Sequence, residues 1–422
     1  MDSKVKEYFT SIGLEDITVL SGGVFLAQLI GIVAQPIATR IYTPEDFGVL
    51  NLILSLTGIF SPIMCLQYEY CIIVAKDHRE ANQVTALCLS LCTGFTVLFG
   101  IGLVIYNLIS PKSFELAGGW LYTAIPILFI TGISSVVTSY NSRYGEFPLI
   151  AKMSVYRAAI SNGVKLLLGA LHVGFPGLLL SNLLSNALGL RKQATVMLVN
   201  RKEILQSKLH DIVGVMKKYR SQALFSTPGV FIVGYSFAVI PMYINALFGT
   251  AQVGFYSLAT SSLSIPLSVV STNVGKVFFR NASKEKNETG MFINTLRKTV
   301  LFLTAISVAG FTVLYFISEP LFGLVFGEEW RISGLFAKYL IPMYAINFVA
   351  NATINGLIIC EEQKKKMMVQ SLFLVFSLAT YLVAKIYALS IGQFLGLVNW
   401  TYVINYLLLM ILLFRKALQI KK

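Results

Sequence analysis

Two ten-residue segments, one in each half of the chain, share a pattern: Thr43-Pro-Glu-Asp-Phe-Gly-Val-Leu-Asn-Leu52 and Gly249-Thr-Ala-Gln-Val-Gly-Phe-Tyr-Ser-Leu258. Aligning them places Gly48 opposite Gly254, an offset of 206 residues. Each segment lies between two long apolar stretches, at the same place in its half of the chain. This pattern predicts two copies of one structural unit, arranged in tandem.

The composition places the chain in a membrane. Of its 422 residues, 55% are hydrophobic and 13% are charged, whereas soluble globular proteins have roughly 45–50% and about 25%. So few charged side chains could not cover the surface of a soluble protein of this length. The first sixteen residues are polar and carry charges of both signs, so no cleavable signal peptide is expected.

Apolar runs long enough to cross a bilayer, about twenty residues each, recur along the chain. We expect an all-α, polytopic membrane protein in which prolines inside the runs kink the helices rather than end them. The twelve predicted spans are 17–39, 47–69, 82–107, 119–140, 152–171, 176–198, 223–245, 252–275, 295–317, 335–357, 367–387 and 392–414.

The distribution of Lys and Arg predicts the orientation. With the N-terminus in the cytoplasm, 28 of the 34 Lys and Arg residues lie on the cytoplasmic side and four on the other. The remaining two, Lys165 and Lys385, lie inside predicted spans. Lys and Arg accumulate in cytoplasmic loops, so both termini are predicted to be cytoplasmic. The net charge of +14 then reflects topology, and no nucleic-acid partner is expected.

A second alignment supports the repeat and sets the domain boundaries. Ile125-Pro126 aligns with Ile341-Pro342 at an offset of 216 residues. Six spans followed by six more, in the same orientation, form a parallel repeat about an axis along the membrane normal. We therefore predict a first lobe at 1–198, a basic cytoplasmic linker at 199–222 and a second lobe at 223–422.

Ionisable side chains inside spans are costly and need an explanation. Arg157, Ser161 and Lys165 recur every four residues and therefore share one helix face, with Asn162 at its edge. Such a cationic stripe suits a lumen that receives an anionic headgroup. In the alternative interpretation, Arg157 reaches the membrane surface and Lys165 pairs with a buried acceptor.

Three further charged residues are candidates. Lys385 lies late in its span, where it either contributes to the substrate path or reaches the outer interface. Arg40 is predicted at the outer mouth of the first span. Glu69, in Gln67-Tyr68-Glu69-Tyr70, is either an interfacial carboxylate or the partner of a lumen cation, and it is our candidate coupling carboxylate.

Uncharged polar side chains form stripes in both halves. Ser21, Gln28 and Gln35 recur every seven residues in the first span. The amide stripe Asn347, Asn351, Asn355 aligns with the hydroxyl stripe Thr131, Ser135, Ser139 at the offset of 216. These faces either line a path for a sugar or hydrogen-bond neighbouring helices to one another.

Catalytic arrangements are not evident in the sequence. The three histidines are far apart, and we find no phosphate-binding loop, nucleophile elbow or metal-ligand cluster. The five cysteines fall in or beside apolar stretches and are interpreted as small buried hydrophobic residues. Because the external loops are also short, transport is favoured over catalysis, and no metal or organic cofactor is expected.

Three segments carry a resemblance to a known family. Arg40-Ile-Tyr-Thr-Pro-Glu-Asp-Phe-Gly48 resembles the R-x-(Y/L)-x-P-E-(D/E)-(F/Y)-G segment of polysaccharide transporters. Gly249 to Ala259, followed by Pro266, is similar to its second-half counterpart, and Asn141-Ser-Arg143-Tyr144 also fits. Across essentially the whole chain, the sequence resembles Wzx-type O-antigen flippases of the multidrug/oligosaccharidyl-lipid/polysaccharide exporter superfamily. One departure is the run Asn273 to Arg280, where such proteins often have a proline.

The resemblance implies a fold and an activity. The fold would be two pseudo-symmetric six-helix bundles that form a V around a central cleft. The activity would be alternating-access transfer of an undecaprenyl-pyrophosphate-linked oligosaccharide from the cytoplasmic to the periplasmic leaflet of a bacterial inner membrane, during lipopolysaccharide biosynthesis. Arg and Lys are the expected partners of the pyrophosphate. The polymerase and chain-length proteins of the same pathway would be partners.

Two other functions are alternatives. A drug antiporter of the same superfamily would be expected to carry acidic residues within the membrane, whereas the definite mid-span charges here, Lys165 and Lys385, are positive. A membrane glycan polymerase or ligase is disfavoured by the short loops and the repeat. The sequence does not identify the sugar, and it leaves the coupling ion open between a proton and sodium.

Overall fold

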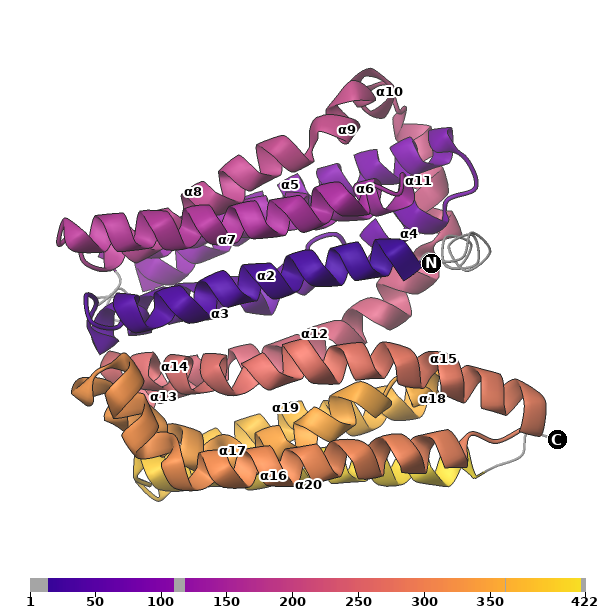
Figure 1. Ribbon diagram of the computed structural model, residues 1–422. Helices are drawn as coiled ribbons and strands as arrows, with labels where there is room; N and C mark the ends of the chain where they lie inside the picture. Colours follow the sequence, from indigo (N-terminus) through magenta and orange to yellow (C-terminus); the bar gives the residue numbers. More distant parts are fainter. Residues whose placement is uncertain (1–13, 110–117, 361, 419–422) are drawn as a thin grey trace. The chain divides into compact units, whose positions relative to one another are not determined.

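The computed structural model describes residues 14–109, 118–360 and 362–418. Its described residues form helices joined by turns and short loops (Figure 1). The chain divides into two compact units, Met1–Gly234 and Tyr235–Lys422, each of which is described below by itself. The predicted all-α class is confirmed, and each of the twelve predicted spans coincides with helical residues.

The described residues of unit 1 form six long helices and several short ones. The longest of them is α5, and α2 packs along α7, which in turn packs along α8. The helices are α2 (Leu14–Ala38), α3 (Pro44–Phe60), α4 (Glu69–Val74), α5 (His78–Ile109), α6 (Ala124–Arg143), α7 (Phe147–Ala170), α8 (Phe175–Gln193), α9 (Thr195–Val199), α10 (Arg201–Leu205) and α11 (Leu209–Lys218), and α12 (Thr227–Ala238) begins in this unit.

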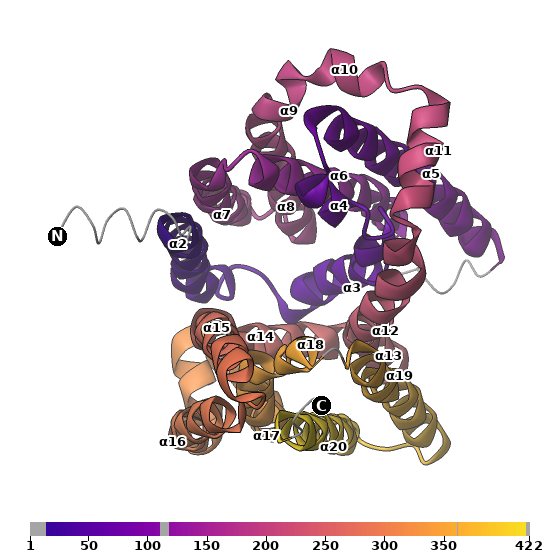
Figure 2. The same ribbon diagram turned by 90° about the vertical axis from the view of Figure 1, so that its right-hand side faces the viewer.

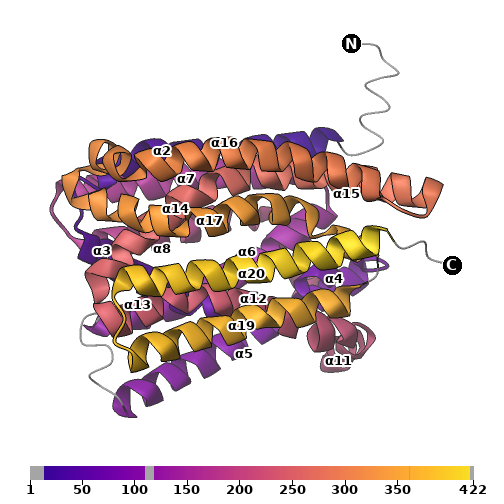
Figure 3. The ribbon, with the colours of Figure 1, turned by 90° about the horizontal axis from the view of Figure 1, so that it is seen from below.

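Unit 2 is a second helical bundle. α16 packs against α17, and α20 packs against both α17 and α19 (Figure 3). Its helices are α13 (Ile240–Phe248), α14 (Thr250–Pro266), α15 (Thr272–Thr289), α16 (Ile293–Phe326), α17 (Arg331–Thr353), α18 (Gly356–Ile359), α19 (Gln363–Ile386) and α20 (Ile391–Ala417).

The repeated segment has a structural role that explains its composition. Thr43 is the N-cap of α3, and its hydroxyl and the Asp46 carboxylate form a reciprocal capping box. The other carboxylate oxygen of Asp46 accepts a hydrogen bond at 2.9 Å from the backbone N–H of Phe175, the first residue of α8. One carboxylate therefore closes two helix N-termini. In the second copy Gly249 occupies the equivalent N-cap of α14, with a left-handed φ of 92°.

The second span is interrupted. After α3, a 3-10 turn at Ser61–Ile63 leads to Leu66 and Gln67, two consecutive non-glycine residues with positive φ (50° and 62°). Such backbone is costly for side chains with a Cβ atom. The Gln67 side chain supports the turn by donating a hydrogen bond at 2.8 Å to the carbonyl of Pro62. The span predicted at 47–69 is thus a helix that breaks near Pro62 and resumes at Glu69.

The run without a proline noted after Asn273 is a continuation of helix. Pro266 is followed by a π-helical turn at Leu267–Ser271, and α15 then continues to Thr289. Gly290, in the left-handed conformation with φ of 77°, ends it. Figures 1 and 3 show that α15 extends past the neighbouring helices of unit 2.

Ten helical segments among the described residues are long and apolar enough to cross a membrane. The other two predicted spans, α7 and α8, have 24 and 19 residues, which is sufficient length. Their hydropathy is lower because α7 carries Arg157 and Lys165, and α8 carries several Ser and Asn residues. Of these two helices, α7 is the one that carries the candidate cations Arg157 and Lys165.

The predicted linker packs onto unit 1. Ile204 and Val215 of the linker, and Met197 just before it, are buried in the same hydrophobic cluster as residues of α5 and α6. Seen along the helices, α9, α10 and α11 form an arch over the end of unit 1 (Figure 2). Tyr68 reinforces this contact, because its hydroxyl donates a hydrogen bond at 3.1 Å to the carbonyl of Met216.

Candidate functional site

The candidate site is centred on Arg157 of α7. Its side chain crosses α8 at Gly189, where an added Cβ atom would lie 2.4 Å from Arg157 Nε. Arg157 Nη2 donates a hydrogen bond at 2.7 Å to Gln193 Oε1, and Arg157 Nε is buried without a hydrogen-bond partner. A guanidinium has five N–H donors, so most of the donor capacity of Arg157 is not used within the described part of unit 1.

Gln193 joins three helices of unit 1. Its side-chain nitrogen donates to the Thr138 hydroxyl at 2.9 Å, and its backbone carbonyl accepts from the Asn141 amide at 2.9 Å. Gln193 is 2% exposed and Asn141 is fully buried. Because both ends of the Gln193 amide are engaged, its oxygen is fixed toward Arg157. Gln193 therefore positions the guanidinium.

Lys165 lies two turns further along α7, about 12 Å from Arg157 along the helix axis. Its side chain is half-buried, and neither Lys165 nor Arg157 forms an ion pair within the part of the chain that the structure describes. The Tyr42 hydroxyl donates at 2.7 Å to the Lys165 backbone carbonyl, which anchors this turn of α7. Pairing of Lys165 with a buried carboxylate is thus not observed over residues 14–109, 118–360 and 362–418.

The other two members of the α7 stripe are arranged differently. Ser161 is half-buried on the same face as the cations. Asn162 is buried, and its amide donates at 2.8 Å to the Ala158 carbonyl of its own helix. That bond uses only one of the two amide hydrogens of Asn162.

Glu69 is a buried carboxyl group at the break in the second span. It is 6% exposed, and its Oε2 has no hydrogen-bond partner. It belongs to a region rich in thiols, because Cys65, Cys71 and Cys88 are buried in the surrounding cluster. No cation pairs with Glu69 among the described residues, so the structure does not bring it together with Arg157 or Lys165.

The polar candidates of this region lie along the C-terminal half of α2 and in the loop after it. Gln28 and Gln35 are half-buried. Arg40 is exposed in the loop between α2 and α3. The α2 helix itself is fixed closely to α7, since an added Cβ atom at Gly23 would lie 2.6 Å from the Cβ of Ala151.

The amide stripe of unit 2 has mixed surroundings. Asn351 is exposed, and its amide donates to the Ser271 hydroxyl at 3.3 Å. Asn355 is exposed and accepts at 3.3 Å from Lys366 Nζ, whereas Asn347 is half-buried. In unit 1, Thr131 and Ser139 lie on the aligned helix α6, with Thr131 exposed and Ser139 buried.

Lys385 lies in the last turn of α19 and is exposed. A lysine in a last turn interacts favourably with the negative end of the helix dipole. This position suits the interfacial interpretation of Lys385, and it does not cluster with the other candidates of unit 2.

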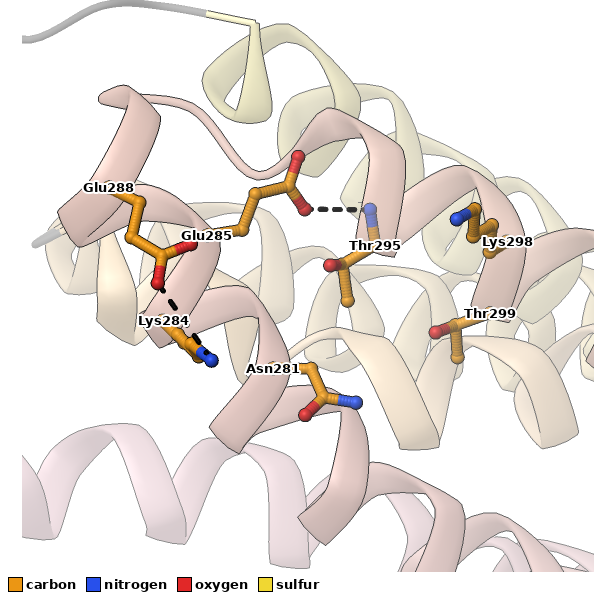
Figure 4. A pocket seen from close by; sticks show the side chains of 7 residues that line it. All are labelled: Asn281, Lys284, Glu285, Glu288, Thr295, Lys298 and Thr299. Atoms are coloured by element: carbon orange, nitrogen blue, oxygen red, sulfur yellow. Dashed lines mark hydrogen bonds and ion pairs between the residues drawn. The ribbon is translucent and has the colours of Figure 1, made fainter.

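A polar cavity of about 390 Å³ lies between α15 and α16, and Figure 4 shows the side chains that line it. The Glu285 carboxylate accepts hydrogen bonds from the backbone N–H groups of Asn294 (3.1 Å) and Thr295 (2.8 Å), and so caps the N-terminus of α16. Glu288 pairs with Lys284 at 3.8 Å on its rim. Because Glu285 already occupies the place that a bound anion would take, the cavity is a capping arrangement.

Several residues that organise the site were not identified from the sequence. Gly189, Gln193 and Thr138 determine where Arg157 lies, yet each is an ordinary residue in a predicted span. Only a contact between helices reveals them. The Asn141-Ser-Arg143-Tyr144 segment also has a structural role, since Arg143 Nη1 donates to the carbonyls of Ile72, Ile73 and Ala75 at the end of α4.

Comparison of the sequence with known families gives one match. The profile of a family described as polysaccharide biosynthesis protein matches residues 37–334. The chain belongs to this family. No curated protein matches the chain. The suspected relationship to polysaccharide flippases is therefore supported at the level of the family.

Solved structures share the fold at low sequence identity. An inward-facing multidrug resistance MATE family transporter of the MOP superfamily is 15% identical, with a TM-score of 0.66 and 93% of each chain covered. The lipid II flippase MurJ, in an inward closed conformation, is 13% identical, with a TM-score of 0.64 over 93% of this chain and 87% of that one. The Vibrio cholerae MATE transporter VcmN, in its bent form, is 15% identical, with a TM-score of 0.54 and 97% of each chain covered. The polysaccharide biosynthesis protein thus has the fold of a MOP-superfamily transporter.

Proposed function

We propose that this protein is a flippase that moves an undecaprenyl-pyrophosphate-linked oligosaccharide, such as an O-antigen repeat unit, from the cytoplasmic to the periplasmic leaflet by alternating access. The family to which the chain belongs is described as polysaccharide biosynthesis protein. The fold of the chain is shared with a protein named as a lipid II flippase. Together these favour transport of a lipid-linked saccharide over catalysis. The membrane would be a bacterial inner membrane, with both termini in the cytoplasm.

The observation that carries the proposal is the pair of cations on α7 without a counter-charge. A buried or half-buried cation is costly unless it is paired. Arg157 and Lys165 form no ion pair within the described residues of unit 1, and Arg157 Nε lacks even a neutral acceptor there. A pyrophosphate supplies the missing negative charge, with Arg157 donating directional hydrogen bonds and Lys165 acting as a point charge.

The remaining candidates would serve the sugar and the coupling ion. Polar side chains such as Gln28, Ser161 and Asn351 would hydrogen-bond the oligosaccharide while the lipid tail stays in the bilayer. Glu69 would be the coupling carboxylate. It is buried, its Oε2 has no hydrogen-bond partner, and a neutral acid is much cheaper to bury there than a carboxylate. A proton is therefore the coupling ion that we favour over sodium, which would require several oxygen ligands.

The distribution of lipid-linked glycan between leaflets tests the proposal. In a deletion strain, the lipid-linked oligosaccharide should accumulate on the cytoplasmic side, and the intact gene should restore its export. Accumulation of unpolymerised units on the periplasmic side would instead indicate a polymerase. An unchanged distribution would indicate an antiporter for other substrates.

A further inference from the structure

Residues 199–222, which include α10, α11 and the last residue of α9, make up most of the arch and are the part meant by that name here. This segment has two faces of opposite character. Its inner face, which includes Ile204 and Val215, is buried in unit 1. Its outer face exposes large apolar side chains: Val199 is 82% exposed, Leu205 81% and Leu209 77%. Isolated exposed apolar residues are ordinary. Three such residues within eleven positions of the sequence, on a segment that already has a packed inner face, favour a second apolar environment.

The α11 helix shows the arrangement most clearly. Val215 and Ile212 pack on unit 1, and His210 and Lys217 lie on the polar side of the helix. Leu209 lies between these two sides, next to Met216, which is also exposed. The apolar face of α11 is therefore wider than the part that unit 1 covers. A helix of this kind lies in the plane of a membrane interface.

The charges of the arch identify the partner. The segment 199–222 carries six Lys and Arg residues and two carboxylates. Lys218 is paired with Glu80, and the Glu203 carboxylate accepts a hydrogen bond from Asn82 at 2.8 Å. The other five cations are exposed and form no ion pair among the described residues: Arg201, Lys202, Lys208, Lys217 and Arg220. Exposed apolar residues interleaved with unpaired cations complement an anionic lipid surface.

We propose that the outer face of residues 199–222 binds anionic phospholipid at the membrane surface. Leu205 and Leu209 enter the boundary between headgroups and acyl chains, and the five unpaired cations contact lipid phosphates. The location is consistent with this role, since the arch joins the end of α8 to the start of α12 and therefore lies at the end of membrane spans. The proposal does not depend on the identity of the transported substrate.

Depth measurements test the apolar part. Leu209→Cys, labelled with an environment-sensitive fluorophore in a Cys360→Ser background, is compared with His210→Cys, which lies about 100° around the same helix. The other four native cysteines are buried. Labelling of the Cys360→Ser protein without a further cysteine therefore measures the background signal. In nanodiscs that contain phosphatidylglycerol, a nitroxide lipid labelled near its headgroup should quench position 209 more strongly, and aqueous iodide should quench position 210 more strongly. Equal access of iodide to both positions, with no lipid quenching at 209, would show that this face is free in water and refute the proposal.

Lipid retention tests the charged part. The variant Lys208→Gln/Lys217→Gln/Arg220→Gln is compared with a control of equal charge loss at another basic region, Arg280→Gln/Lys284→Gln/Arg297→Gln. Native mass spectrometry of the purified protein counts bound phosphatidylglycerol and phosphatidylcholine. Cations near an anionic surface strengthen binding severalfold each, so the arch variant should bind phosphatidylglycerol at least about tenfold more weakly than the control. Equal losses in the two variants, or equal retention of the two lipids by the unsubstituted protein, would contradict recognition of anionic lipid by the arch.

Discussion

Gln193 Oε1 accepts the hydrogen bond from Arg157 Nη2 at 2.7 Å, and the other end of the same amide donates to Thr138 at 2.9 Å. Gln193 thus holds the Arg157 guanidinium in place, and Thr138 in turn holds the Gln193 side chain in place. Hydrogen bonds of this kind reduce the number of orientations that a long side chain can adopt. In the proposed function, this preorganisation holds Arg157 ready for the pyrophosphate and leaves its remaining donors for the substrate.

Gly189→Ala should displace Arg157 and reduce export of the lipid-linked glycan. The added Cβ would lie 2.4 Å from Nε and 2.5 Å from Cγ of Arg157, so the side chain would have to leave its position. Gly163→Ala in α7 is the matched control, because an added Cβ there meets nothing within 4 Å. Export is measured together with membrane abundance. If Gly189→Ala exports as well as Gly163→Ala does, the fixed position of Arg157 is not required.

Lys165→Ala should impair export, and Lys165→Arg should retain part of it, because the role assigned to this residue is to hold an anion. Lys152→Ala is the control on the same helix, where the lysine is exposed and lies about 140° around from Arg157. Abundance and thermal stability of each variant separate transport from folding. Normal export by Lys165→Ala at normal abundance would remove Lys165 from the substrate site.

The all-α membrane fold was largely predictable from the sequence, because the length and hydropathy of each span depend on residues close together in the chain. The cationic stripe of α7 was predictable for the same reason, since i, i+4 spacing places Arg157 and Lys165 on one face. The position of Arg157 was not, because it depends on contacts of α7 with α8 and α6 at Gly189 and Gln193. The break at Leu66 was also missed, since two left-handed non-glycine residues leave no compositional signal.

The segment 43–52 shows a different limit of prediction from sequence. Its sequence carried the family resemblance, yet the resemblance did not reveal that the Asp46 carboxylate caps both α3 and α8. Asp46→Ala should therefore destabilise unit 1 by about 1–2 kcal/mol, since it removes caps from two helices and each cap contributes typically about 1 kcal/mol. Glu45→Ala removes an exposed carboxylate of the same first turn and serves as the control. Thermal unfolding of the purified variants measures the difference, and equal midpoints would refute the double cap.

Glu362, just before α19, should make the free energy of unfolding depend on pH. Hydrogen bonds from Lys416 and Lys365 hold the pKa of Glu362 below its usual range. Because the pKa is lower in the folded state, the contribution is present above the unfolded pKa, roughly 4.3, and is lost as the pH falls through the folded pKa. The midpoint of unfolding should decrease between about pH 6 and pH 3. Glu362→Gln should show a smaller decrease over that interval, and an identical pH profile would contradict this role.

Labelling of the amide stripe distinguishes a substrate path from contacts between helices. Asn347 and Asn351 lie on α17, whereas Asn355 lies past its end, as the N-cap of α18. Asn351 is exposed, and its amide donates a hydrogen bond to the Ser271 hydroxyl at 3.3 Å. This contact is compatible with a residue that lines a sugar path and with one that joins two helices. A cysteine at 351, in a Cys360→Ser background, should react with a small hydrophilic maleimide if water and sugar reach this face. Thr353→Cys, at a fully buried position on the same helix, should stay unreactive. Alternating access also requires the reactivity at 351 to change between inward-open and outward-open states. If thiols at 347, 351 and 355 are inert in every accessible state, and Asn351→Leu damages folding more than transport, the stripe holds helices together and the sugar follows another path.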